Sequence, residues 1–189
     1  MKKIMFFIYN EMVDYEFSLA ADLLGYSNEF EVFTASYDKS PVKSKAGIIY
    51  QPTYDLDEVM EIENIDGIVI TGGWRRNKDE RLTALLEKLN KEEKLIAAVC
   101  AGPEFLTDTN ILKSYNYTSS LPHEEYIKNN EEDPFPREKF INESVVRDRN
   151  LITAKGEAFI DFAIEIADWL NLFENFDKKE EVRKTFKIY

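Results

Sequence analysis

The feature of this chain that most constrains its fold is the alternation of short apolar runs with segments of helical periodicity. Residues 3–9, 67–71 and 95–99 are apolar runs of strand length. Between them, apolar residues recur at the spacing of one helix face. The two clearest sets are Phe17, Ala20, Ala21 and Leu24, and Leu82, Leu85, Leu86 and Leu89. Buried strands that alternate with helices predict an α/β fold, in which helices cover both faces of a mostly parallel sheet.

Weaker patterns predict the remaining elements of the first half. Residues 29–34 alternate in the manner of a strand, and residues 42–50 predict a hairpin or a short strand pair. Gly102 and Pro103 are expected to open a helix after the apolar run at 95–99, because proline is favoured at the first helical position.

The second half ends in a predicted hairpin and a helix. Residues 115–120 predict a short strand, and residues 144–156 predict two strands that form a hairpin. The last amphipathic helix carries Phe159, Phe162, Ala163, Ile166 and Leu170. No repeat or linker interrupts the chain. We therefore expect one domain over residues 1–172, followed by a charged C-terminal tail at 173–189.

Charge and cysteine content restrict the partners. The formal net charge is −12, and Lys and Arg are scattered. Nucleic acid is therefore not expected as a partner, because phosphate binding needs a concentrated basic face. The chain has one cysteine, which excludes an internal disulfide and a multi-cysteine zinc site. We expect no cofactor and no metal, and a small-molecule substrate or oxidant as the ligand.

No apolar run approaches the roughly 20 residues that a membrane helix needs. The first apolar run is short, and Asn10, Glu11 and Asp14 follow it without a small-residue cleavage site. With no export signal and no disulfide, we expect a cytoplasmic protein without a membrane partner.

Three segments follow directly after predicted strands: residues 10–16, 72–76 and 100–102. In open α/β sheets, ligands bind beyond the carboxyl ends of the strands. If the three strands are neighbours, the three segments meet at one edge of the sheet.

Cys100 follows the apolar run at 95–99 and precedes Ala101 and Gly102. A sharp strand-to-helix turn would present this thiol as a nucleophile, and the N–H groups of the following helix would stabilise its thiolate. The small neighbours would let the backbone turn tightly. The alternative is a structural thiol that closes a buried strand, since free cysteine is among the most buried residue types.

Two backbone amides near Cys100 are candidates for an oxyanion hole. The Gly72-Gly73 loop would supply one N–H group, from Gly73, and Ala101 would supply the other. The alternative for the glycine pair is a turn that needs a positive φ.

Two ionisable residues are candidates to assist the thiol. Glu16 would lie beside Cys100 at the sheet edge, where a protonated carboxyl could hydrogen-bond the thiolate. Alternatively, Glu16 only favours a first helical turn that Asp14 caps. His123 is the single histidine of the chain and the only imidazole available as a general base. It also suits an exposed helix start, beside Glu124 and Glu125.

The segment "AAVCAGPEFL", preceded by "GIVITGG" and by an early "DYEF", resembles the ThiJ/PfpI superfamily. The C-terminal segment from residue 145 resembles the closing hairpin and helix of that superfamily, so the resemblance covers residues 2–172. It implies a flavodoxin-like α/β sandwich that is related to class I glutamine amidotransferase domains and commonly forms a homodimer. It also implies that Cys100 is the elbow cysteine, that Glu16 touches it, and that Gly73 and Ala101 offer the oxyanion N–H groups.

The sequence departs from the superfamily at the histidine that often precedes a proline. Leu121 takes that place before Pro122, and His123 lies two residues later. Ala101 stands where the peptidase-like branch has a histidine. These departures argue against glutaminase and peptidase activity.

Three functions remain open. The first is a cysteine-dependent enzyme that acts on small carbonyl or amide substrates, as a deglycase, glyoxalase or amidase-like hydrolase. The second is a redox-sensing or stress-response protein, whose cysteine is oxidised to sulfinic acid. The third is a non-catalytic binding module.

Overall fold

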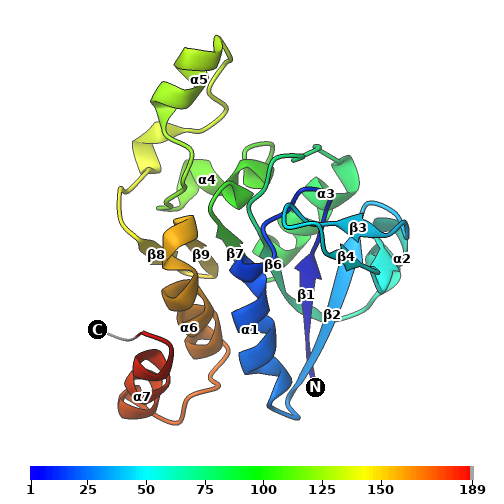
Figure 1. Ribbon diagram of the computed structural model, residues 1–189, viewed down its shortest axis with the longest axis vertical. Helices are drawn as coiled ribbons and strands as arrows, with labels where there is room; N and C mark the ends of the chain where they lie inside the picture. The colour runs from blue at the N-terminus through cyan, green and yellow to red at the C-terminus, as the bar shows by residue number, and fades with distance from the viewer. Residues whose placement is uncertain (188–189) are drawn as a thin grey trace.

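The computed structural model describes residues 1–187 of the chain. Its centre is a seven-stranded sheet in the order β5-β2-β1-β6-β7-β9-β8 (Figure 1). All neighbouring strands are parallel except β8, which runs antiparallel to β9. The strands are β1 (Lys2–Phe7), β2 (Phe30–Ser36), β5 (Tyr54–Asp55), β6 (Ile65–Ile70), β7 (Leu95–Val99), β8 (Val145–Asp148) and β9 (Leu151–Ala154). The predicted mostly parallel sheet is confirmed.

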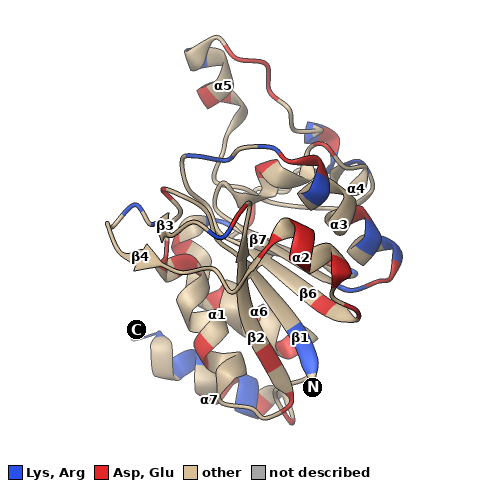
Figure 2. Cartoon of the chain, turned by 90° about the vertical axis from the view of Figure 1, so that its right-hand side faces the viewer, with Lys and Arg blue, Asp and Glu red and all other residues tan. Residues whose placement is uncertain are grey.

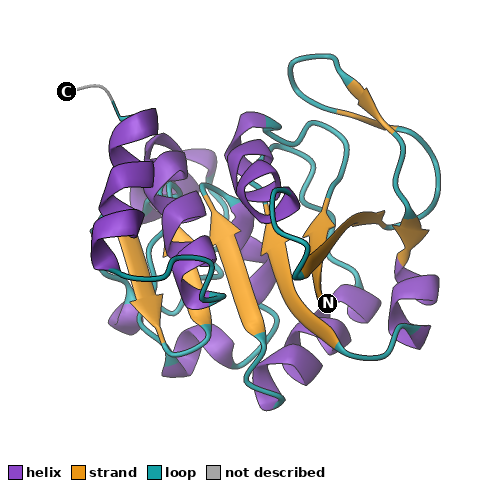
Figure 3. Ribbon diagram, turned by 90° about the horizontal axis from the view of Figure 1, so that it is seen from below, coloured by secondary structure: helices purple, strands orange, loops and turns teal. Residues whose placement is uncertain are grey.

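Helices lie on both sides of the sheet, as Figure 3 shows. Helix α1 packs against α6, and α2 packs against α3. The helices are α1 (Tyr15–Gly25), α2 (Leu56–Glu61), α3 (Glu80–Lys91), α4 (Ile111–Ser114), α5 (His123–Asn129), α6 (Phe159–Trp169) and α7 (Phe176–Phe186). A layer of helices, the sheet and a second layer of helices therefore form the flavodoxin-like sandwich that the sequence predicts.

The apolar runs of the sequence form the core. All five residues of β7 are fully buried, and so are Ile68, Val69 and Ile70 of β6. Each fully buried aliphatic side chain of this kind contributes about 1.5–3 kcal/mol through burial. The central strands are therefore rigid, and they fix the positions of the residues that follow their carboxyl ends.

The two predicted hairpins are present. A small antiparallel pair joins β3 (Val42–Lys43) to β4 (Ile49–Tyr50) outside the main sheet. β8 and β9 pair at the edge of the main sheet.

The predicted strand at residues 115–120 is wrong. Only Tyr117 makes a bridge there, with Phe140. Side chains hold the rest of the segment instead: Thr153 Oγ1 accepts the N–H of Thr118 at 2.8 Å, and the Ser119 hydroxyl donates to Cys100 O at 2.9 Å.

The helix expected at Gly102-Pro103 is a short 3-10 helix, η1 (Gly102–Leu106). Gly102 is packed so closely over the end of β6 that a Cβ there would lie 2.8 Å from Ile70 O. The Thr107 hydroxyl donates to Glu104 O at 2.8 Å where the turn ends.

After Ser120 the chain leaves the body of the domain to form α5, which stands out at one end (Figure 1). Tyr126 is the only buried residue of this helix. Asn130 ends it in the left-handed conformation, with φ 56°. The 3-10 helix η2 (Arg137–Lys139) lies on the return path.

Helix α7 lies in the part of the chain that the sequence marks as a charged tail. It has no buried residue and packs on α6 through ion pairs. Lys179 Nζ lies 2.7 Å from Glu165, and Arg183 Nη2 lies 3.2 Å from the same carboxylate. Acidic and basic residues are correspondingly interspersed along α7 (Figure 2). Among the helices of residues 1–187, none has the length and apolar character needed to cross a membrane.

Candidate functional site

The strands that precede the three candidate segments are neighbours. β1 pairs with β6, β6 with β7, and β7 with β9. Because these pairs are parallel, the segments after them meet at one sheet edge. The edge has a fourth contributor that the sequence analysis did not include, the segment after β9 that begins at Lys155.

Cys100 occupies a sharp turn at the end of β7. Its φ is 61°, a left-handed conformation that is uncommon for a residue other than glycine. Its N–H donates to Ala154 O at 2.8 Å. Its carbonyl accepts the Ser120 N–H and the Ser119 hydroxyl, both at 2.9 Å. Neighbouring segments thus fix the turn on both sides and hold Cys100 half-buried.

Glu16, in the first turn of α1, lies beside this thiol. It is 2 % exposed, and its Oε2 accepts the Gly72 N–H at 2.6 Å. The Cys100 thiol lies next to the same carboxyl group: a Cβ on Gly156 would lie 3.1 Å from both Cys100 Sγ and Glu16 Oε1. Asp14 makes no capping hydrogen bond; its carboxylate accepts the Tyr50 hydroxyl at 3.3 Å instead. The structure therefore brings Cys100 and Glu16 together.

Burial governs the protonation of both groups. It raises the pKa of Glu16 to about 7, although the bonds from Gly72 and Cys100 act in the opposite direction. Burial, and then the charge of Glu16, raise the pKa of Cys100 to about 11. The thiolate expected from a helix N-terminus is thus not favoured, because burial and the neighbouring charge of Glu16 both oppose it. Between about pH 7 and 11 the pair holds one proton.

Two glycines make room for the pair. A Cβ on Gly72 would lie 2.9 Å from Cys100 Sγ and 2.6 Å from Cys100 Cβ. A Cβ on Gly156 would lie 3.1 Å from both Cys100 Sγ and Glu16 Oε1. Cys100 Sγ and the Glu16 carboxyl therefore fit close to the backbone at Gly72 and Gly156, because neither glycine carries a side chain.

Ser120 completes the surroundings of the sulfur. Its Oγ accepts the Gly156 N–H at 2.9 Å, which leaves its hydroxyl hydrogen free to point elsewhere. Hydrogen bonds from the Ser120 hydroxyl and the Ala101 N–H to Cys100 act to lower the pKa of the thiol. Both groups therefore stabilise negative charge on the sulfur.

The Gly73 N–H makes no hydrogen bond within residues 1–187. The loop around it is fixed, since Val13 N–H donates to Gly72 O at 2.9 Å and Trp74 N–H donates to Glu11 O at 3.2 Å. Gly73 has φ 155°, and a Cβ there would lie 2.7 Å from Glu11 O. The position therefore requires glycine.

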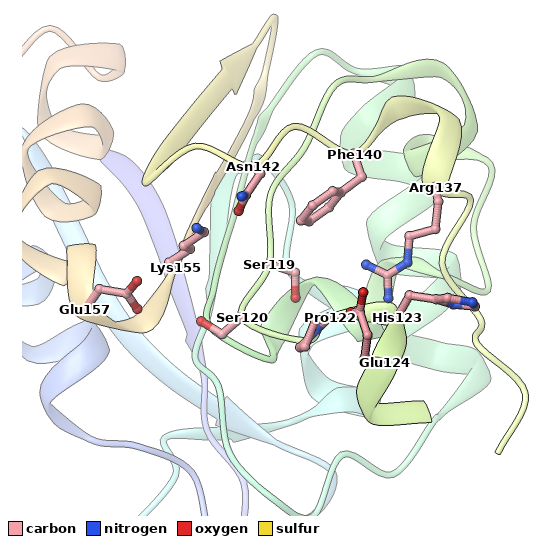
Figure 4. Close-up of a pocket in the computed structure, with 10 residues that line it drawn as sticks. All are labelled: Ser119, Ser120, Pro122, His123, Glu124, Arg137, Phe140, Asn142, Lys155 and Glu157. Carbon is pink, nitrogen blue, oxygen red and sulfur yellow. The ribbon is translucent and has the colours of Figure 1, made fainter. Parts of the chain in front are cut away.

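His123 is held away from the pair. It is the first residue of α5, and its Nδ1 lies 2.6 Å from Asp133 Oδ2. Figure 4 shows its ring turned away from Ser120. Leu121, which stands in the place of the superfamily's histidine, packs against the core. No hydrogen bond of His123 within residues 1–187 reaches Cys100 or Glu16.

A cavity of about 800 Å³ lies beside Ser120. It opens between α5 and the segment after β9 (Figure 4). Polar and apolar surfaces both line it, from Ser119, Ser120, Pro122, His123, Glu124, Arg137, Phe140, Asn142, Lys155 and Glu157. Ser120 connects this cavity to the thiol, because it lines the cavity and also interacts with Cys100. Cys100 and Glu16 themselves are not among the lining residues. Within the described residues, no three His, Cys, Asp or Glu side chains gather as a metal site.

Sequence reasoning missed Ser120 and Gly156 as site residues. The rule for strand ends finds Gly156 once it is applied to β9, which follows β7 in the sheet. Ser120 has no comparable signal, because its position depends on the irregular segment after α4.

The chain resembles known proteins over nearly its whole length. The model of the DJ-1/PfpI family matches residues 2–168. "Uncharacterized protease YdeA" of Bacillus subtilis is 28% identical over 97% of this chain and 89% of its own length. "Deglycase PfpI" of Pyrococcus furiosus is 30% identical over 63% of this chain and 72% of its own length. In fold, the chain is similar to the DJ-1 superfamily protein Atu0886 from Agrobacterium tumefaciens, with a TM-score of 0.82, 24% identity, and coverage of 98% of this chain and 97% of the other. The protein therefore belongs to the DJ-1/PfpI family.

Proposed function

We propose that this protein is a cysteine-dependent enzyme that acts on small carbonyl compounds, in the manner of a deglycase or glyoxalase. The observation that carries the proposal is the proximity of Cys100 Sγ and the Glu16 carboxyl, which would both lie 3.1 Å from a Cβ at Gly156, near a cavity of about 800 Å³ that Ser120 lines. A buried carboxyl with a pKa of about 7 can take up and release a proton at neutral pH. A thiol next to such a group can add to an aldehyde without a histidine.

The first step is the addition of Cys100 Sγ to the aldehyde carbon. The C–S bond forms while the S–H bond breaks, and ionised Glu16 accepts the thiol proton. The carbonyl oxygen gains negative charge, which the N–H groups of Gly73 and Ala101 would stabilise. Glu16 then returns its proton to this oxygen and yields a neutral hemithioacetal, so atoms and charge balance.

Two observations favour a carbonyl substrate over an amide. Hydrolysis of an amide needs a group that protonates the leaving amine, and His123 is bound to Asp133 rather than to Cys100. The relative from Pyrococcus furiosus is named a deglycase. Amidase, peptidase and glutaminase activities are therefore less well supported.

The test is the rate of methylglyoxal consumption by the wild type and by Cys100→Ser. The serine hydroxyl is a far weaker nucleophile, so we expect a loss of at least about a hundredfold. Asp108→Asn is the control, because Asp108 pairs with Lys78 and is not among the residues that line the cavity. Turnover that persists in Cys100→Ser would refute the proposal.

Redox sensing is the second candidate, and the protonation of Glu16 favours it. A carboxyl with a pKa of about 7 keeps its proton at mildly acidic pH, so it can donate a hydrogen bond to an oxidised sulfur. Intact-mass measurement after mild peroxide treatment tests this function. We expect one or two added oxygen atoms on the peptide that contains Cys100, and an unmodified peptide would count against it.

A homodimer is a further proposal. Ile48 and Ile49 of the β3–β4 hairpin are 54 % and 68 % exposed, and Trp74 is 59 % exposed. Exposed apolar side chains of this size favour an interaction surface. Light scattering coupled to size-exclusion chromatography would distinguish a dimer from a monomer.

A further inference from the structure

One oxygen atom of Glu104 joins two segments that flank the site. Glu104 lies in η1, directly after the Cys100 turn. Its Oε2 accepts hydrogen bonds from Arg76 Nε at 3.1 Å and Arg76 Nη2 at 2.9 Å. The same atom accepts the Tyr126 hydroxyl at 2.8 Å. None of these side chains has a role in the chemistry proposed above.

Arg76 connects this oxygen to the Gly72-Gly73 loop. Its Nη1 donates to Gly73 O, and two backbone hydrogen bonds hold the residues on either side of Gly73. Glycine is the residue with the greatest backbone freedom. A bond to its carbonyl therefore limits the rotation that would turn the Gly73 N–H away from the site.

Tyr126 connects the same oxygen to α5. It is the only buried residue of that helix, and its ring packs edge-on against Phe135 at 6.2 Å. His123 and Glu124 of the same helix line the cavity. The Tyr126 hydroxyl thus fixes the helix that forms one wall of the cavity.

Burial strengthens these bonds. The side chains of Arg76 and Glu104 are 18 % and 16 % exposed, and charge-assisted hydrogen bonds are stronger than neutral ones. Burial, followed by the charge of Glu104, raises the pKa of Tyr126 well above its usual value. The hydroxyl therefore keeps its proton and donates at any pH where the protein is folded.

We propose that Glu104 is a positioning residue that couples the α5 wall of the cavity to the Gly73 end of the oxyanion site. A substrate that rests against α5 then meets the Gly73 N–H in its working position. The kinetic consequence rests on the proposed function, whereas the coupling itself is a property of the folded protein.

Three variants separate the bonds of Glu104 to Arg76 from its bond to Tyr126. Tyr126→Phe removes only the bond to α5. Arg76→Lys keeps the charge but cannot hold both Glu104 and Gly73 as the guanidinium does. Glu104→Gln weakens the bonds to both Arg76 and Tyr126. Asp108→Asn is the matched control, since Lys78 and Asp108 form a more exposed ion pair, at 2.5 Å, between the chain that follows Arg76 and the chain that follows η1.

The first readout is hydrogen exchange in the full-length protein, which needs no turnover. We expect Glu104→Gln to speed exchange about tenfold in peptides covering both residues 72–76 and residues 121–129. Tyr126→Phe should act mainly on residues 121–129 and more weakly on residues 72–76. Asp108→Asn should leave both unchanged.

The second readout is the kinetics of methylglyoxal consumption. We expect Tyr126→Phe to raise KM about threefold with little change in kcat, and Glu104→Gln to lower kcat about tenfold. The double variant should be no worse than Glu104→Gln alone, because both substitutions act through one oxygen.

Two outcomes would overturn the proposal. In the first, exchange at residues 72–76 stays at the wild-type rate in both Glu104→Gln and Arg76→Lys. In the second, the effects of Glu104→Gln and Tyr126→Phe on exchange simply add. If the wild type consumes no carbonyl substrate, the proposed function fails, and the exchange data still decide whether Glu104 couples the two segments.

Discussion

The Cys100 turn lies next to the cavity-lining Ser120, and helix α5 lines the cavity, but the two are built in different ways. Backbone groups fix the turn: Ala154 O, at the end of β9, and the Ser120 N–H. Helix α5 depends on side chains, chiefly the Tyr126 hydroxyl and the bond between His123 and Asp133. The sheet thus determines where the sulfur lies, whereas a few replaceable side chains determine the shape of the space in front of it.

The most damaging change on the turn side, short of replacing the thiol, is Glu16→Gln. Gln can still accept the Gly72 N–H, but it cannot accept the thiol proton. We expect turnover of methylglyoxal to fall about a hundredfold. In the wild type, activity should rise with pH through about 7 as Glu16 ionises, and this limb should be missing from the pH profile of the variant. An unchanged profile would show that Glu16 is not the proton acceptor.

Gly156→Ala tests the space around the pair with one added methyl group. That carbon would lie 3.1 Å from Cys100 Sγ and from Glu16 Oε1, so one of them has to shift. We expect about a tenfold loss of kcat/KM with a folded protein. Gly25→Ala is the control, because nothing lies within 4 Å of a Cβ at Gly25. Equal activity in both variants would contradict the tight fit.

Glu16 should also make stability depend on pH. Its pKa is about 7 in the folded protein against an ordinary value of 4.5, so the folded state binds the proton more tightly. The free energy of unfolding contributed by this group therefore falls as pH rises from 4.5 to 7.

Glu16→Gln removes this dependence. We expect the variant to be more stable than the wild type by about 1–3 kcal/mol at pH 8, with little difference at pH 4. Urea unfolding at the two pH values measures it. A variant that is destabilised equally at both would show that Glu16 is not buried with a raised pKa.

The smallest effect is expected on the α5 side, from His123→Ala. Because His123 binds Asp133 and not the thiol, kcat should change by less than about twofold. A rise in KM would be consistent with a slightly displaced wall. A loss of kcat beyond about tenfold would place the imidazole in the chemistry, and the contrast between the two regions would then fail.

The same contrast explains what the sequence could predict. Hydrophobic periodicity and strand ends place Cys100, Glu16 and Gly73 at one sheet edge, because those positions follow from local patterns and parallel pairing. No local sequence pattern or strand pairing predicts the positions of helix α5 and Ser120. The strand predicted over residues 115–120 is absent, because Thr153 and Cys100 bind this segment without a continuous ladder.

The protonation of the pair was also beyond sequence reasoning. A cysteine at the start of a helix suggests a stabilised thiolate. Burial of the thiol raises its pKa most, and the charge of Glu16, 84 positions away in the chain, raises it further. Neither cause can be read from the residues around Cys100.

The left-handed backbone at Cys100 has a consequence for every substitution at this position. With φ at 61°, any residue except glycine carries roughly 1 kcal/mol of strain there. Cys100→Ser keeps this strain, whereas Cys100→Gly relieves it and loses the packing of the side chain. The turn therefore gives up some folding stability in order to carry a side chain at its tip.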